Sequence, residues 1–296
     1  MKKTIYKLAG IVLAGIFLAG CGKAGDSGNT IKVGSKDFTE NLVISEVYAL
    51  ALEDAGLQVE RIPNIASSVI HTSIVNGEID IYPEYTGTGL LSILKMPMET
   101  DPTAVYEIVK KEYNDKFKLT WLDYSPANDS QGLVIKTSKA DELGIETISD
   151  LQKNASQLRF ASQGEFDKRE DGIAGLEKLY GKFDWKSHTV YDNSLKYQVL
   201  KNDEADVTPA YTTEGQLVNK DEFKVLVDDK QFWPPYNLAP VVKNEVLEKH
   251  PEVEDILNSL SKEFTTDTIV ALNAQVDVEG KEYEIVAKEF YQSIKK

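Results

Sequence analysis

Two tyrosines occupy matching places in a repeated segment, where an aromatic face could attract a cation. Residues 76–89 (NGEIDIYPEYTGTG) and 202–215 (NDEADVTPAYTTEG) are identical at seven of fourteen positions and lie 126 residues apart. Each copy ends a β-rich run and then presents a Tyr-Thr pair, with Tyr85 in the first copy and Tyr211 in the second. At strand ends beside Pro and Gly, these rings either face a ligand or pack as core aromatics.

The elements around the repeat indicate an α/β protein with mostly parallel sheets. Apolar patterning predicts strands, and helices between them, up to the first tyrosine, and the same alternation resumes over about 158–206. The C-terminal stretch 252–296 is predominantly helical in character. In open α/β sheets ligands bind outside the carboxyl ends of the strands, so two related lobes would place the tyrosines on opposite walls of one cleft. The expected early elements are strands 30–34, 59–62 and 79–82 and helices 38–55 and 67–75.

Net charge and the absence of catalytic motifs exclude several classes of function. The net charge of −15 becomes about −18 once a signal with three lysines is removed, which argues against nucleic acid as a partner. It mildly favours a cationic or zwitterionic ligand, although acidity would also keep an exported protein in solution. The sequence has no Walker loop and no Gly-x-Ser-x-Gly elbow, and its three histidines lack zinc-ligand spacing. We therefore expect no enzyme activity, no metal and no cofactor.

The first twenty residues predict an export signal. Basic residues precede the apolar run 8–17, which is too short for a permanent membrane helix. The run Leu-Ala-Gly-Cys then resembles a bacterial lipobox, which predicts a lipid on Cys21, the only cysteine. An ordinary secretory signal with an incidental cysteine is the alternative. Residues 21–30 would form the lipidated tether, holding the protein at the outer face of the cytoplasmic membrane.

Several motifs, in order along the chain, resemble the substrate-binding proteins of osmoprotectant ABC importers, which is the glycine betaine, carnitine and choline family. The resemblance covers almost the whole chain after the signal, and the Pro-Glu-Tyr-Thr-Gly-Thr run is its most specific part. The motifs are 34–40 (GSKDFTE), 76–88 (NGEIDIYPEYTGT), 166–172 (FDKREDG), 210–215 (AYTTEG) and 234–236 (PPY).

The resemblance implies a two-lobed type II periplasmic binding protein with a hinge and a central ligand cleft. Lobe 1 would comprise residues 31–133 and 236–296, and lobe 2 would comprise residues 134–235. The protein would act as a monomer, capture a small quaternary-ammonium ligand and deliver it to an ABC permease in the membrane.

The family encloses the ligand's cationic head with four tyrosines, and three of these positions match Tyr85, Tyr211 and Tyr236. A trimethylammonium group has no N–H to donate, so ring quadrupoles are a suitable means of recognising it. The fourth position is Gln131, in the run Asn-Asp-Ser-Gln. Either the cage is incomplete, or a neighbouring ring such as Tyr124 or Trp233 substitutes, or the ligand differs.

A ligand with a carboxylate also needs a cationic clamp, and the resemblance assigns this role to Lys36 and Arg169. The planar guanidinium of Arg169 can hold a carboxylate through two bonds, although a surface or interdomain ion pair is the alternative. Thr88, and Thr86 beside it, could bond the ligand or cap the following helix.

Three other functions are open. The same kind of importer component could take another cationic zwitterion, such as ergothioneine, if Gln131 bonds an extra heteroatom of the ligand. A surface lipoprotein could have kept the fold and lost the ligand, which predicts no small-molecule affinity. An enzyme on this scaffold would require turnover of one of these amines.

Overall fold

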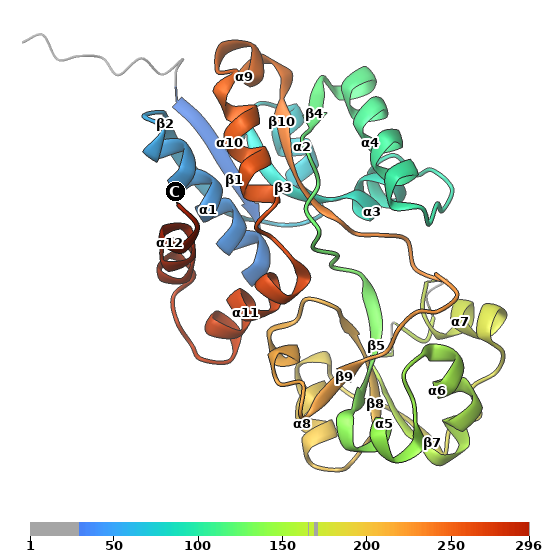
Figure 1. The fold of residues 1–296 in the computed structure, drawn as a ribbon. Coiled ribbons are helices and arrows are strands. Elements are labelled where there is room, and N and C mark those ends of the chain that lie inside the picture. The colour runs from blue at the N-terminus through green and yellow to red at the C-terminus, as the bar shows by residue number, and fades with distance from the viewer. Residues whose placement is uncertain (1–29, 165, 169–170, 296) are drawn as a thin grey trace, which may run out of the picture.

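The computed structural model describes residues 30–164, 166–168 and 171–295. Within these residues the chain forms two α/β lobes, joined by extended segments that cross between them (Figure 1). Lobe 1 is defined here as the part built on the sheet that contains the N-terminal strand, and lobe 2 as the part built on the other sheet. The expected signal peptide, Cys21 and Arg169 lie outside the described residues.

Each lobe has a five-stranded sheet, and the two sheets have the same topology. The order is β2-β1-β3-β10-β4 in lobe 1 and β7-β6-β8-β5-β9 in lobe 2. The lobe 1 strands are β1 Thr30–Lys36, β2 Gln58–Ile65, β3 Ile81–Tyr85, β4 Leu119–Trp121 and β10 Leu238–Lys243. The lobe 2 strands are β5 Gln131–Lys136, β6 Arg159–Ser162, β7 Ser187–Val190, β8 Val207–Tyr211 and β9 Phe223–Val225.

The sheets are more mixed than the sequence patterning predicted. In lobe 1, β1 pairs in parallel with β2 and β3, whereas β10 is antiparallel to β3 and β4. Lobe 2 repeats this arrangement, because β6 pairs in parallel with β7 and β8 while β5 is antiparallel to β8 and β9. The expectation of mostly parallel sheets is therefore right in that all strands of a sheet but one run in the same direction. It is wrong in that the reversed strand makes two of the four strand pairs in each sheet antiparallel. The reversed strands, β10 and β5, are the ones that enter from the other lobe.

Helices flank both sheets. Lobe 1 carries α1, α2, α3 and α4 and the C-terminal helices, and lobe 2 carries the helices between β5 and β8 (Figure 1). The lobe 1 helices are α1 Thr39–Asp54, α2 Ile70–Val75, α3 Thr86–Thr88, α4 Pro102–Phe117, α9 Asn244–Lys249, α10 Glu252–Ser261, α11 Thr266–Asp277 and α12 Tyr283–Ile294, and the π-helical turn η1 Gly89–Ile93 follows α3. The lobe 2 helices are α5 Thr137–Leu143, α6 Ile148–Asn154, α7 Ile173–Tyr180 and α8 Lys196–Lys201, with the short 3₁₀ helices η2 Ala155–Gln157, η3 Asn193–Leu195 and η4 Gly215–Val218.

Local sequence explains where several helices begin and end. Asp101 caps α4 by accepting a 2.8 Å hydrogen bond from the backbone N–H of Ala104, and Pro102 occupies the first turn. Thr147 and Asp150 form a capping box at the start of α6. The other early helices and strands lie close to their predicted ranges, but β3 begins two residues later than the predicted strand 79–82 and extends to Tyr85. Helix α1 ends just before Gly56, whose φ of +86° suits glycine.

The repeated aspartate does the same structural work in both lobes. Asp80 accepts a 2.9 Å hydrogen bond from the backbone N–H of Lys32, and Asp206 accepts an equal one from Arg159. The backbone N–H of each aspartate donates in return to the carbonyl of the same partner. Each aspartate thereby fixes the start of the tyrosine-bearing strand against its parallel neighbour. The expectation of two related lobes is confirmed by these matching bonds and by the matching strand orders.

Two segments cross between the lobes, 122–130 from β4 to β5 and 226–237 from β9 to β10. They pair with each other at Asn128 and Asn237, which form an isolated antiparallel bridge. A further contact joins α11, which packs against α1, to η4 of lobe 2. At Gly215 an added Cβ would lie 2.7 Å from the backbone nitrogen of Ala274, so only glycine allows this approach.

Candidate functional site

A cavity of about 560 Å³ lies between the lobes. Six of the seven side chains predicted to bind ligand line it: Lys36, Tyr85, Thr88, Gln131, Tyr211 and Tyr236. The seventh, Arg169, lies outside the described residues. The other lining residues are Phe38, Thr39, Glu40, Ser67, Ser92, Asp129, Thr213, Glu214, Asn273 and Asp277. Residues far apart in sequence are thus brought to one place.

Tyr85 is held firmly at the end of β3. Its side chain belongs to the lobe 1 core and only 3% of the residue is exposed. The hydroxyl donates a 2.8 Å hydrogen bond to Glu40, and the ring stacks on Phe38 with 6.2 Å between centroids. Burial raises the pKa of the Tyr85 hydroxyl well above its ordinary value, so the ring stays neutral.

Tyr211 occupies the matching place at the end of β8 but is exposed by 49%. Its backbone N–H donates a 2.9 Å hydrogen bond to the Glu214 carboxylate. The two repeat tyrosines therefore do lie on walls of one cavity, as the sequence predicted, and differ sharply in burial.

Tyr236 comes from the second crossing segment. Its backbone N–H donates a 2.7 Å hydrogen bond to the side chain of Asn128 in the first crossing segment. Its ring lies so close to Gly87 that an added Cβ there would be 2.8 Å from two ring carbons. A glycine directly after the Tyr-Thr pair of lobe 1 therefore makes room for the third tyrosine.

Gln131 is at the first position of β5, the position to which the resemblance assigned the fourth tyrosine of the cage. Its side-chain amide donates a 2.7 Å hydrogen bond to the Asp171 carboxylate, and the indole of Trp233 donates a 2.8 Å bond to the Asp171 carbonyl. Among the described residues, neither Trp233 nor Tyr124 lines the cavity, so neither takes the place of the absent tyrosine there. The additional ring on the wall is Phe38, which sequence reasoning did not select although it lies in the quoted run 34–40.

Lys36 lines the cavity, but its ammonium is already engaged. It forms an ion pair with Glu84, and only 4% of the Lys36 side chain and 1% of the Glu84 side chain are exposed. The ammonium also lies 5.0 Å from the centroid of the Tyr85 ring. Its contacts in the structure thus support Tyr85 directly.

The threonines after the tyrosines bind the crossing segments. The Thr86 hydroxyl donates to the Pro235 carbonyl and accepts from the backbone N–H of Asn237, both at 3.0 Å. In lobe 2 the Thr212 hydroxyl donates at 2.7 Å to the Asn128 carbonyl and accepts at 3.0 Å from the N–H of Ser130. Thr88, in contrast, is one of the residues that line the cavity.

Carboxyl groups dominate the charge of the wall. Burial raises the pKa of Glu40 and of Asp277, and burial together with the nearby charge of Glu40 raises the pKa of Asp129 well above its ordinary value. In the part of the chain that the structure describes, none of these three carboxyls forms an ion pair. A cation entering the cavity would stabilise their ionised forms.

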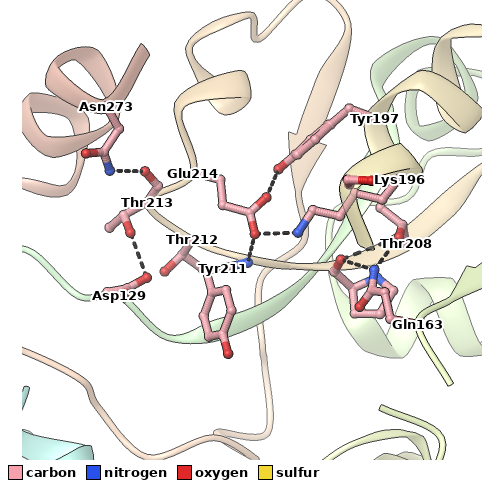
Figure 2. A network of polar contacts seen from close by, with 12 residues as sticks. Asp129, Gln163, Lys196, Tyr197, Thr208, Tyr211, Thr212, Thr213, Glu214 and Asn273 are labelled. Carbon is pink, nitrogen blue, oxygen red and sulfur yellow. Dashed lines mark hydrogen bonds and ion pairs between the residues drawn. The ribbon is translucent and has the colours of Figure 1, made fainter. Parts of the chain in front are cut away.

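A polar network connects Asp129 with Glu40 across the lobes, and Figure 2 shows its part from Asp129 through Thr213 to Asn273. The Thr213 hydroxyl donates a 2.6 Å hydrogen bond to Asp129, while the Thr213 carbonyl accepts a 2.8 Å bond from the Asn273 amide of α11. The same amide reaches Glu40 on α1 at 3.3 Å. Sequence analysis did not select Glu40, Asp129 or Thr213, although each lies in a quoted run, and it did not select Asn273, which lies outside every such run.

Among residues 30–164, 166–168 and 171–295, no group of three or more His, Cys, Asp or Glu side chains could hold a metal ion. Over the same residues, no helix has both the length and the apolar character needed to cross a membrane.

Two α/β lobes that close on a cavity at the strand ends, with two crossing segments between them, define a substrate-binding protein of the type II periplasmic class. The chain belongs to the family described as the substrate-binding domain of the ABC-type glycine betaine transport system, whose sequence profile matches residues 29–293. The resemblance stated from the motifs is thereby confirmed.

Known relatives agree with this assignment. The carnitine transport binding protein OpuCC of Listeria monocytogenes is 32% identical over 99% of this chain and 97% of its own length. A glycine-betaine-binding protein of Pseudomonas aeruginosa is 33% identical over 98% of this chain and 94% of its own length. A solved structure titled as a glycine betaine/carnitine/choline ABC transporter superimposes with a TM-score of 0.85 at 31% identity, covering 89% of this chain and 98% of the other.

Proposed function

We propose that this protein captures a quaternary-ammonium compound of the glycine betaine, carnitine or choline type in the interlobe cavity and delivers it to an ABC permease. The observation that carries the proposal is the meeting of three tyrosines from three separate segments in one cavity lined by carboxyl groups. The names of the relatives point to the same class of ligand.

The physical basis is attraction of a cation that cannot donate a hydrogen bond. Each ring face contributes about 0.5–2 kcal/mol, more when water is excluded. Tyr85, Tyr211 and Tyr236 together would supply several kcal/mol, and the ionised carboxyls that line the cavity would add long-range attraction. Such a sum is adequate for micromolar capture.

For a ligand that also bears a carboxylate, we propose Arg169 as the clamp, with Thr88 and Gln131 as hydrogen-bonding neighbours. Arg169 remains a sequence-based assignment. Lys36 remains a candidate contact because it lines the cavity, although its pairing with Glu84 favours a supporting role. Binding and release would involve no covalent chemistry.

The remaining assignments from the sequence are proposals as well. They are a signal at residues 1–20, a lipid on Cys21, a tether over 21–30, a monomeric protein at the outer face of the cytoplasmic membrane, and lobes divided at 133/134 and 235/236. Because all of β5 belongs to the lobe 2 sheet, we propose moving the first division to residue 131.

Calorimetric titration of the protein from residue 22 onward tests the function. The ligands are glycine betaine, carnitine, choline, proline betaine and ergothioneine, and the protein is first verified as folded and ligand-free. Tight binding of one of the first four supports the proposal. Binding of ergothioneine alone would favour that second ligand class, and failure of all five would overturn the assigned ligand class.

A further inference from the structure

A glutamate carboxylate accepts the backbone N–H of each repeat tyrosine, and it is buried in lobe 1 but partly exposed in lobe 2. In lobe 1, Glu84 accepts a 2.9 Å hydrogen bond from the backbone N–H of Tyr85 and a 3.1 Å bond from the hydroxyl of Tyr82. The same carboxylate forms the ion pair with Lys36. One carboxylate therefore receives a tyrosine N–H, a phenol and a lysine.

Lobe 2 has the same set of donors around Glu214 (Figure 2). Glu214 accepts a 2.9 Å hydrogen bond from the backbone N–H of Tyr211 and a 2.6 Å bond from the hydroxyl of Tyr197, and it pairs with Lys196. The oxygens divide alike in both lobes, because Oε1 takes the N–H and the lysine while Oε2 takes the phenol.

The two arrangements are built from non-equivalent residues. Glu84 precedes its tyrosine by one position, whereas Glu214 follows its tyrosine by three, and the repeat partner of Glu84 is Ala210. Lys36 ends β1, but Lys196 begins α8. Sequence duplication therefore cannot account for the likeness. What the two sites share is the need to hold the backbone of a tyrosine at the end of a strand.

We propose that Glu84 and Glu214 are positioning residues for the cage tyrosines, and that Lys196 acts on ligand affinity through Glu214. The proposal rests on the proposed function, because it assumes that Tyr85 and Tyr211 face the ligand. A backbone N–H bonded to a charged carboxylate is held more strongly than one bonded to a neutral acceptor. The lysine compensates the charge that this carboxylate would otherwise place in a poorly solvated site.

The position of the tyrosine should depend more on the supporting glutamate and lysine in lobe 2 than in lobe 1. Tyr85 is also held by core packing and by its hydroxyl bond to Glu40. Tyr211 is half-exposed, and its support is itself more open, with 8% of the Lys196 side chain and 18% of the Glu214 side chain exposed. Loss of the support should therefore disturb Tyr211 more than Tyr85.

The direction in which Lys196→Met changes ligand affinity distinguishes a positioning role of Lys196 from a direct electrostatic effect on the ligand. Among the described residues Lys196 does not line the cavity, but its charge lies close to it through Glu214. Removing a positive charge near a cationic ligand would, by Coulomb's law alone, tighten binding. If Lys196 acts by positioning, Lys196→Met loosens Tyr211 and weakens binding instead.

The experiment compares Lys196→Met, Tyr197→Phe and Lys196→Arg with a matched control, Lys201→Met. Lys201 lies on the same helix and pairs with Glu222 at the surface, so its loss removes equal charge without touching Glu214. Affinity for the tightest-binding compound of the five is measured by calorimetry, and thermal unfolding verifies that each variant is folded. Fluorotyrosine incorporation with ¹⁹F NMR follows Tyr211, whose resonance is identified by its absence in Tyr211→Phe.

We expect Lys196→Met to weaken binding about fivefold or more, because it removes an ion pair, and Tyr197→Phe about twofold to threefold, because it removes one hydrogen bond and leaves the ion pair in place. Lys196→Arg should restore most of the affinity, and Lys201→Met should leave it unchanged. The Tyr211 resonance of ligand-free Lys196→Met should shift or broaden. Equal or tighter binding in Lys196→Met with an unchanged Tyr211 resonance would overturn the proposal. If wild-type protein binds none of the compounds, the proposed function fails, and the ¹⁹F resonance still decides the positioning role.

Discussion

The two lobes share a strand order and a repeat, yet they present their tyrosines in opposite ways. Tyr85 is buried, stacked and hydrogen-bonded in lobe 1, whereas the Tyr211 side chain of lobe 2 is half-exposed. Tyr236 joins the lobe 1 wall because its ring packs over Gly87. One wall of the cage is therefore formed before ligand arrives, and we infer that the ligand docks on lobe 1 and that closure brings Tyr211 onto it.

The largest expected effect comes from Tyr85→Ala. Removing a buried aromatic ring should lower the free energy of unfolding by about 3–5 kcal/mol, and binding should be lost with it. Chemical denaturation and calorimetry measure the two effects. Tyr85→Phe keeps the ring and loses only the bond to Glu40, so it should cost about 0.5–1.5 kcal/mol of stability. A Tyr85→Ala protein as stable as wild type would show that the lobes do not differ in this way.

Gly215→Ala tests the contact between the lobes. The new Cβ would meet the backbone of α11 at 2.7–2.9 Å, so we expect a loss of about 1–3 kcal/mol of stability and a more open protein. Small-angle scattering with saturating ligand measures the opening through the radius of gyration. The control is Gly89→Ala, its repeat partner, where the Cβ would meet Trp121 within lobe 1. Equal opening in both variants would contradict a special role for the η4–α11 contact.

Tyr211→Ala should separate binding from stability. Because the ring is half-exposed, we expect the free energy of unfolding to change by less than about 0.5 kcal/mol, whereas binding should weaken by at least about 1 kcal/mol. Titration and thermal unfolding of the same preparation check both values. Tyr211→Phe keeps the aromatic face and should bind nearly as well as wild type. Unchanged affinity in Tyr211→Ala would remove Tyr211 from the cage.

The smallest effect is a dependence of affinity on pH. Burial raises the pKa of Glu40 above 4.5, and burial with the charge of Glu40 raises that of Asp129 above 3.8. Choline carries no group that titrates in this range, so its affinity should rise as pH increases through the raised pKa values and the carboxyls ionise. Calorimetry between pH 4.5 and 7.5 measures this rise.

Stability without ligand should change in the opposite direction. Groups whose pKa is higher in the folded state bind protons more tightly there, so their contribution is present below the unfolded pKa and is lost as pH rises through the folded value. Glu40→Gln should flatten both profiles, and Asp123→Asn, an exposed acid of the first crossing segment, should flatten neither. A choline affinity independent of pH would show that these carboxyls do not sense the cation.

Much of the architecture could be predicted because it is written in periodic or repeated features. The repeat located both tyrosine-bearing strands, and α1 and the early strands follow from apolar spacing and from Gly56. The antiparallel strands could not be predicted in this way, because the direction in which a chain re-enters a sheet depends on its path through the other lobe. Sequence patterning describes a segment, not its neighbours.

The sequence analysis predicted the tyrosines that line the cavity but not most of its polar lining residues. Tyr85, Tyr211 and Tyr236 follow from motifs. Asn273 lies in no motif, and Asp129, although it lies in the run quoted for Gln131, meets its partner Thr213 only by tertiary packing. The expected cationic role of Lys36 also depended on a partner the sequence could not assign, since Glu84 lies 48 positions away. Partners of buried charges are decided by folding.

The threonine bonds described above bear on how such a protein could change its ligand. Thr86 and Thr212 follow Tyr85 and Tyr211 directly and hydrogen-bond to the crossing segments. Substitutions near these tyrosines would therefore change the contacts between lobes and crossing segments as well as the cage. The Gln131 side chain bonds Asp171 instead, outside these threonine links. Ligand selectivity could therefore change through substitutions at position 131 while the threonine bonds that link each lobe to the crossing segments stay the same.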